Sequence, residues 1–143
     1  MVSLNNKKKN SKLIAEQVIN LEIDALRLLK KFLNKNFDKA VNAIVNCQSK
    51  IILCGVGKSG LIASKIASTM SSVGSPSFSL SANDCLHGDL GSISKKDLLI
   101  IISNSGKSKE LLPIIKFANR NKIKLIGIVS EKNSSLYKGS DIR

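Results

Sequence analysis

Three short polar loops of this 143-residue sequence contain the side chains that could take part in chemistry. The first, at residues 55–60, reads GVGKSG and includes one lysine among glycines. The second, at residues 103–108, reads SNSGKS and supplies three hydroxyls. The third, at residues 83–91, reads NDCLHGDLG and contains the one histidine of the chain. Glycine, serine and lysine together suit an anion-binding site, and a histidine can add proton transfer.

The loop at residues 55–60 lies between an apolar run and a helical pattern, which places its backbone N–H groups at a helix start. Such groups favour an anion, Lys58 puts a cation in the same place, and Ser59 adds a hydroxyl. Three glycines let a ligand approach the backbone closely: Gly55, Gly57 and Gly60. The alternative without a functional role is a tight strand-to-helix turn with an exposed lysine.

Two nucleotide-binding motifs are similar to this loop but are incomplete. The G-x-G-x-x-G pattern of dinucleotide-binding folds expects an acidic residue about twenty positions later, where Ser79 and Ser81 stand. A P-loop needs a glycine at the position of Ile52. A nucleotide-binding protein therefore ranks below a site for a small phosphorylated ligand.

The serine loop follows the most apolar run and precedes a helix. Ligands of open parallel sheets bind beyond the carboxyl ends of the strands, where helix starts point free N–H groups at them. Hydroxyls there can donate to phosphate oxygens without carrying a charge, and the loop contains Ser103, Asn104, Ser105, Gly106 and Ser108. Ser105 or Ser108 could instead only cap the helix, which is compatible with anion binding.

The third loop and the residue after the serine loop supply titratable groups. His87 could act as an acid, a base or a hydrogen-bond donor, although a lone histidine is often structural. A metal site formed by Cys85, His87 and Asp89 is a weaker alternative, because no second histidine or thiolate has the expected spacing. Glu110 is either a carboxylate favoured by a helix start or a candidate base.

The periodicity of apolar residues predicts the elements that position these loops. Spacings of three and four over residues 11–33 predict an amphipathic helix, followed by a shorter second helix. From residue 50, short apolar runs alternate with helical stretches, which predicts an α/β fold: a three-layer α-β-α sandwich with a mostly parallel, Rossmann-like sheet. We expect strands at 51–54, 76–80, 98–102 and 125–129, a fifth strand starting at 141–142, and helices at 110–121 and 134–138.

Composition limits the class of protein. With 43% hydrophobic residues the chain can bury one core. We expect a basic tail at 1–12 and one domain at 13–143, with N-terminal helices at 13–47 and an α/β core at 50–143. The net charge of +13 does not indicate a nucleic-acid partner, because the lysines are spread along the chain and only 3% of residues are aromatic.

The cysteines and the hydropathy pattern predict the compartment. Cys47, Cys54 and Cys85 are odd in number and form no C-x-x-C pair, which favours a reducing environment. The polar amino terminus has no signal-peptide core, and no apolar run is long enough to cross a bilayer. We therefore expect a cytoplasmic protein without a membrane partner.

The three loops together, in this order, resemble the sugar isomerase (SIS) domain family. The serine loop is similar to the phosphosugar-binding signature of that family. The serine loop, GVGKSG and the HGDLG segment at 87–91 occur together in a way that is most similar to the D-arabinose 5-phosphate isomerases. This likeness covers residues 13–143. The resemblance implies interconversion of D-ribulose 5-phosphate and D-arabinose 5-phosphate, on the route to Kdo for lipopolysaccharide or capsule.

The resemblance also implies roles for individual residues. Glu110 or His87 would move the proton through an enediol, and Lys58 would stabilise the charge that develops on oxygen. The phosphate would be held by Ser103, Asn104, Ser105, Ser108 and Ser59. The family needs no organic cofactor, takes a sugar phosphate as its small-molecule partner, and builds its site at subunit interfaces of a homo-oligomer.

The family domain continues past a fifth strand to a further glutamate and a second histidine, often followed by regulatory CBS modules. The resemblance therefore implies that this sequence stops before the domain ends. Two alternatives share the serine loop: a non-catalytic SIS module that binds or senses phosphosugars, and an isomerase for another sugar phosphate.

Overall fold

The computed structural model describes the backbone of residues 4–143 and the side chains of residues 10–143. The chain divides between Phe37 and Asp38 into two compact units. The first contains helix α1 (Leu4–Lys30). This helix begins earlier than the predicted residue 11, because no glycine or proline interrupts the lysine-rich segment and lysine favours helix. The basic tail expected at 1–12 is therefore helical from Leu4 onward, and residues 1–3 lie outside the described part.

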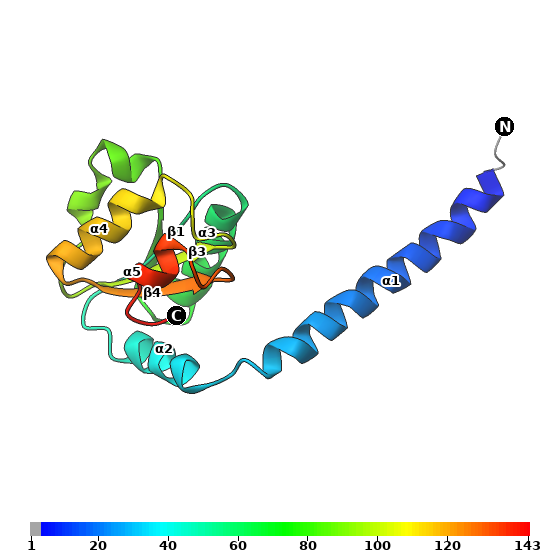
Figure 1. The fold of residues 1–143 in the computed structure, drawn as a ribbon, viewed down its shortest axis with the longest axis horizontal. Helices are drawn as coiled ribbons and strands as arrows, with labels where there is room; N and C mark the ends of the chain where they lie inside the picture. The colour runs from blue at the N-terminus through cyan, green and yellow to red at the C-terminus, as the bar shows by residue number, and fades with distance from the viewer. Residues whose placement is uncertain (1–3) are drawn as a thin grey trace. The chain divides into compact units, whose positions relative to one another are not determined.

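The second unit is built on a four-stranded parallel sheet with the strand order β2-β1-β3-β4 (Figure 1). Its strands lie within about one residue of the predicted positions, which confirms the α/β prediction. Their bounds are β1 (Ile51–Gly55), β2 (Ser77–Ser81), β3 (Leu98–Ser103) and β4 (Lys124–Val129). The expected fifth strand is present as a parallel bridge between Ile142 and Ile126 of β4.

Helices cover both faces of this sheet (Figure 1). On one face, α4 (Leu111–Asn121) and α5 (Ser135–Gly139) pack against the sheet. On the other face, α3 (Lys58–Ser72) packs against β1, and residues 40–44 of α2 (Lys35–Val45) join the same core. The segment between β2 and β3 contains two short 3₁₀ helices, η1 (Asp84–His87) and η2 (Asp89–Ser92).

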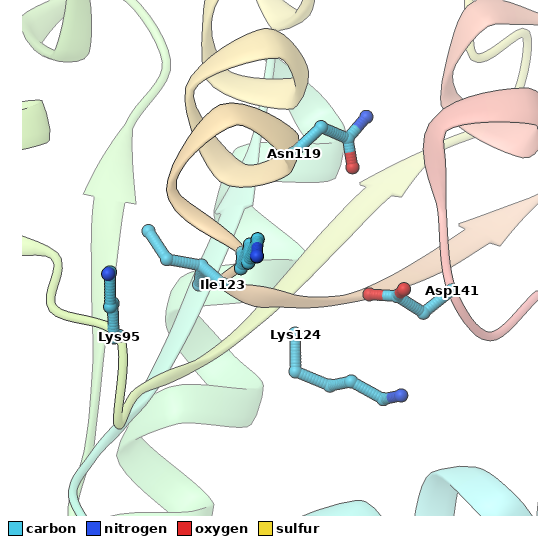
Figure 2. Close-up of a pocket in the computed structure, with 6 residues that line it drawn as sticks. Lys95, Asn119, Ile123, Lys124 and Asp141 are labelled. Atoms are coloured by element: carbon cyan, nitrogen blue, oxygen red, sulfur yellow. The ribbon is translucent and has the colours of Figure 1, made fainter.

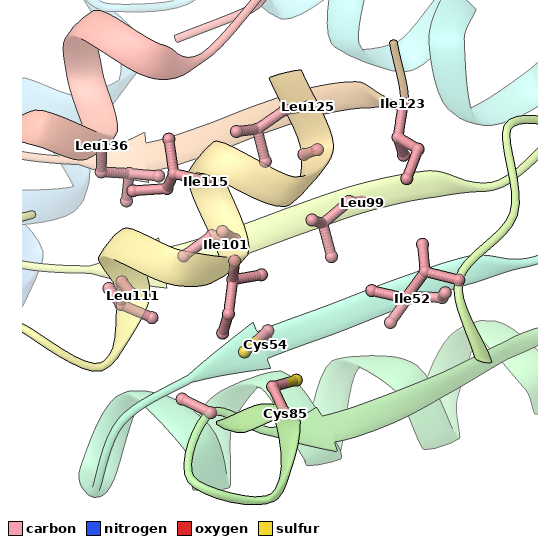
Figure 3. Packing of buried hydrophobic residues seen from close by; sticks show 14 residues of the cluster. Ile52, Cys54, Cys85, Leu99, Ile101, Leu111, Ile115, Ile123, Leu125 and Leu136 are labelled. Carbon is pink, nitrogen blue, oxygen red and sulfur yellow. The ribbon is translucent and has the colours of Figure 1, made fainter. Parts of the chain in front are cut away.

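The two cores form because successive strand residues point to opposite faces of the sheet. Ile52, Leu99 and Leu125 are fully buried beneath α4, and Figure 3 shows them in one layer. Leu53 and Ile100 face α3. Burial on both faces explains why the strands read as continuous apolar runs rather than as an alternating pattern.

Two close approaches around glycines position the loops at the carboxyl ends of the strands. A Cβ on Gly55 would lie 2.7 Å from the backbone of Ser59, so β1 and the start of α3 can touch only without a side chain there. Gly106 has a φ of +61°, and a Cβ on it would collide with Ser134 and lie 2.6 Å from Val129 Cγ2. The serine loop is therefore fastened against the segment that follows β4.

An ion pair joins Lys50 and Asp97, the residues directly before β1 and β3, at the amino ends of these two parallel strands. The Asp97 side chain is fully buried, and its Oδ2 accepts from Lys50 Nζ at 2.8 Å and from the Ser94 N–H at 2.6 Å. Burial raises the pKa of Asp97, but the Lys50 ammonium and the hydrogen bonds outweigh burial and lower that pKa to about 2. Asp97 therefore stays ionised over the ordinary pH range.

We predict that Asp97→Asn lowers the free energy of unfolding at neutral pH by roughly 2 kcal/mol. Because the folded-state pKa lies below the unfolded value of 3.8, this contribution is fully present above about pH 5 and is lost as the pH falls towards 2. Urea unfolding of wild type and variant between pH 7 and pH 2 measures it. Asp38→Asn, at an exposed position of α2, is the control and should have little effect. A stability difference that does not shrink with acidification would contradict this account.

We predict that Gly106→Ala destabilises the chain by about 3 kcal/mol, because the methyl group adds a steric clash to an unfavourable φ. Gly57→Ala is the matched control: φ is +56° there, but no atom lies within 4 Å of the added Cβ. It should cost less than Gly106→Ala, about 1–2 kcal/mol, because only backbone strain contributes. Thermal unfolding of both variants measures the difference, and equal losses would show that the contact with Ser134 is unimportant.

Candidate functional site

A pocket of about 300 Å³ lies at the carboxyl ends of the strands, where open parallel sheets bind ligands. It brings together three residues that the sequence singled out, Ser59, Ser103 and Asn104. Ser59 comes from the first turn of α3, and the other two come from the end of β3 and the residue after it. The remaining lining residues are Ile102, Ile128, Val129 and Ser130.

The serines of the second loop also organise its backbone. The Ser103 side chain is buried, and its Oγ accepts a hydrogen bond from the Gly106 N–H at 3.0 Å. Ser105 Oγ accepts from the Lys107 N–H at 3.3 Å. Each hydroxyl keeps its own proton for donation, so these bonds are compatible with holding an anion. Glu110 occupies the N-cap position of α4 without a side-chain cap hydrogen bond, so neither Ser105 nor Ser108 acts as the cap.

The segment after β4 is a wall of the pocket that the sequence did not indicate. Ser130 Oγ donates to Asn104 Oδ1 at 2.8 Å, and the Ser130 N–H donates to the Asn104 carbonyl at 3.1 Å. The Leu136 N–H donates to the Gly106 carbonyl at 3.1 Å, which adds a second link. A single serine after a strand forms no motif. Its position directly after the strand predicted at 125–129 was the available signal.

The three predicted catalytic residues lie around the loops but do not line this pocket. Lys58 is the first residue of α3 and is exposed, directly before Ser59. Glu110 is half-buried just before α4, and His87 is exposed at the end of η1. All three lie in segments that follow the carboxyl ends of parallel strands. The fold thus brings their segments to one edge of the sheet, and their roles stay predictions.

The serine loop also contains a lysine. Lys107 is exposed, and its Nζ lies 3.9 Å from Glu131 Oε2, which is also exposed. Such an exposed pair contributes little to stability. Ser59 and Ser108 make no side-chain hydrogen bond within residues 10–143, so their hydroxyls are available to a ligand. Hydroxyls, helix-start N–H groups and lysines therefore occur together at this site, a combination that suits an anion.

A second and larger pocket, of about 370 Å³, lies at the opposite edge of the sheet (Figure 2). Its lining includes Lys95, Lys122 and Lys124, but Lys95 and Lys124 point in different directions in Figure 2. Asp141 lies among them, and its Oδ2 accepts from the Leu125 N–H at 2.8 Å. Because Lys95 and Lys124 do not converge, this pocket is a weaker candidate than the smaller one.

In the part of the chain that the structure describes, no group of three or more histidine, cysteine, aspartate or glutamate side chains could hold a metal ion, and this includes Cys85, His87 and Asp89. No helix there has the length and apolar character that spanning a membrane requires.

Comparison with known proteins identifies the family. The family model described as SIS domain matches residues 44–143. An uncharacterised protein of Rickettsia prowazekii is 42% identical over 92% of this chain and 41% of its own length. Arabinose 5-phosphate isomerase KdsD of Yersinia pestis is 41% identical over 89% of this chain and 39% of its own length. The chain thus spans about two fifths of the curated relatives that it matches.

Solved structures agree with this assignment. An E. coli CFT073 protein, solved in complex with arabinose 5-phosphate, has a TM-score of 0.87 and 32% sequence identity to this chain. The match covers 94% of this chain and 71% of that one. Because the family model matches most of its length, the chain belongs to the SIS domain family.

Proposed function

We propose that this chain is the sugar-phosphate-binding part of an aldose–ketose isomerase that interconverts D-ribulose 5-phosphate and D-arabinose 5-phosphate. The observation that carries the proposal is the pocket that joins Ser59, Ser103 and Asn104 at the carboxyl edge of the sheet. Hydroxyl and amide groups beside two helix starts suit a phosphate monoester. A volume of about 300 Å³ suits a small ligand such as a pentose phosphate.

The relatives support the choice of substrate. KdsD proteins, with identities of up to 41%, carry the name arabinose 5-phosphate isomerase, and a structural neighbour with 32% identity was solved in complex with that sugar phosphate. The proposal transfers that substrate to this chain. Supply of arabinose 5-phosphate for Kdo, a cytoplasmic location and a homo-oligomer with shared sites belong to the same proposal.

The proposed chemistry is proton transfer between adjacent carbons. A base removes a proton from C1 of ribulose 5-phosphate, the electrons move to the C2 carbonyl, and an enediolate forms. Return of a proton to C2 and collapse of the C1 hydroxyl to an aldehyde give arabinose 5-phosphate. Glu110 or His87 is the proposed proton carrier, and the Lys58 ammonium is proposed to stabilise the enediolate oxygen. None of these steps needs an organic cofactor.

The overall test uses the 143-residue chain with ribulose 5-phosphate in D₂O. We expect arabinose 5-phosphate that carries deuterium at C2, because the transferred proton exchanges with solvent on the base. Binding without turnover would favour the second candidate, a non-catalytic phosphosugar-binding module. The absence of both binding and turnover would contradict the proposed function.

We predict that Ser59→Ala weakens binding of arabinose 5-phosphate about tenfold, because one hydrogen bond to a charged phosphate is lost. The melting temperature without ligand should not change, since the Ser59 hydroxyl has no partner within residues 10–143. Isothermal titration of the sugar phosphate measures the affinity. Ser68→Ala, on an exposed part of α3, is the control. Equal affinities of the two variants would remove Ser59 from the phosphate site.

We predict that Lys58→Ala lowers kcat by about a hundredfold or more while the fold is retained, because the enediolate loses its cation. The coupled isomerase assay measures the rate, and circular dichroism checks the fold. Lys65→Ala, exposed and further along the same helix, is the matched control with the same change in net charge. A similar loss in both variants would indicate a general electrostatic effect rather than a role for Lys58.

A further inference from the structure

Two free thiols lie together in the core, outside the proposed site. Cys54 and Cys85 are 0% and 2% exposed, and both belong to the cluster beneath α4. Cys54 is the next-to-last residue of β1, directly before Gly55. Cys85 lies in η1, two positions before His87. The pair therefore connects the strand that leads into the first loop with the loop that contains the histidine.

The two sulfur atoms are close enough to influence each other. Figure 3 shows the Cys54 and Cys85 side chains next to one another at the edge of the cluster. Hydrogen bonding between the thiols raises the pKa of Cys54 and lowers the pKa of Cys85. Burial, Asp89 and Asp84 oppose the lowering at Cys85. Cys85 lies in the short turn η1, whereas Cys54 lies within β1, so a local opening of the turn exposes Cys85 first.

We propose that Cys54 and Cys85 are an oxidation site at which a hydroperoxide forms an intramolecular disulfide, fastening η1 to the end of β1. The Cys85 thiolate attacks one peroxide oxygen, the O–O bond breaks, and the leaving oxygen takes up a proton as water. The resulting Cys85 sulfenic acid is attacked by the Cys54 sulfur, which forms the S–S bond and releases a second water. Two thiols are oxidised as one hydrogen peroxide is reduced to two waters.

The surroundings of Cys85 allow this reaction in the folded chain. Its neighbours Asp84 and Leu86 are exposed, and η1 is a single short turn. Local opening of such a turn exposes the thiol to a small oxidant without global unfolding. The third thiol, Cys47, lies outside this cluster: its Sγ contacts the Lys50 carbonyl at 3.5 Å, near the start of β1. Cys47 therefore provides a matched control within the same chain.

The test treats the reduced 143-residue chain with hydrogen peroxide, alkylates the remaining thiols and digests with trypsin. Trypsin cleaves after lysine, so the three cysteines fall into separate peptides, 40–50, 51–58 and 66–95. We expect 51–58 linked to 66–95, alkylated Cys47, a loss of two hydrogens from the intact mass, and reversal by dithiothreitol. Amide exchange of residues 84–87 should also slow after oxidation, independently of any sugar phosphate.

Two variants and the unfolded chain are the controls for this experiment. Cys47→Ser should form the same linked peptide, and Cys54→Ser should not. Peroxide treatment in urea should give mixed pairings that include Cys47, because the fold no longer selects the partners. Linkage through Cys47 in the folded chain, or oxidation of Cys85 to sulfinic acid without linkage, would overturn the proposal. Since the wild-type digest alone decides this, poor folding of a variant does not obscure the result.

Discussion

The parallel pairing of β1 with its two neighbours is the constraint on which the rest of the structure depends. Gly55 pairs with Ser81 on one side and with Ile102 on the other, and Ser103 pairs with Val129. Every loop after these residues therefore starts at the same edge of the sheet. A slip of one residue would exchange the side chains of β1 between the two cores, so that Ile52 would face α3 and Leu53 would face α4. The hydrophobic burial that stabilises the sheet thus also determines where the polar loops meet.

The sequence predicted the elements well because their signals are local. Buried strands read as apolar runs, and helix α4 follows its periodicity to within one residue of the predicted bounds. The start of α1 was less predictable, because lysine and asparagine carry no apolar periodicity although they tolerate helix. Boundaries of this kind depend on small differences in propensity rather than on burial.

The sequence indicated some residues of the candidate site and missed others, and the reason is again physical. The glycine and serine motifs indicated Ser59, Ser103 and Asn104, which meet in the pocket. Ser130 was missed because its contact with Asn104 is long-range, across two neighbouring strands. The hydrogen bond that Ser103 accepts from the Gly106 N–H was also hidden, since a sequence cannot show whether a serine hydroxyl accepts from its own loop. Motifs indicate which residue types are present, whereas partners depend on the fold.

The ion pair between Lys50 and Asp97 lies at the edge of the sheet opposite the pocket. This ion pair and the residues proposed to bind a ligand are thus separated by the length of the strands. Substitutions at one edge can accumulate with little effect on the other, because distant sites contribute nearly additively. Because of this separation, substitutions at the pocket edge can change which ligand is bound while the ion pair at the other edge keeps the sheet stable.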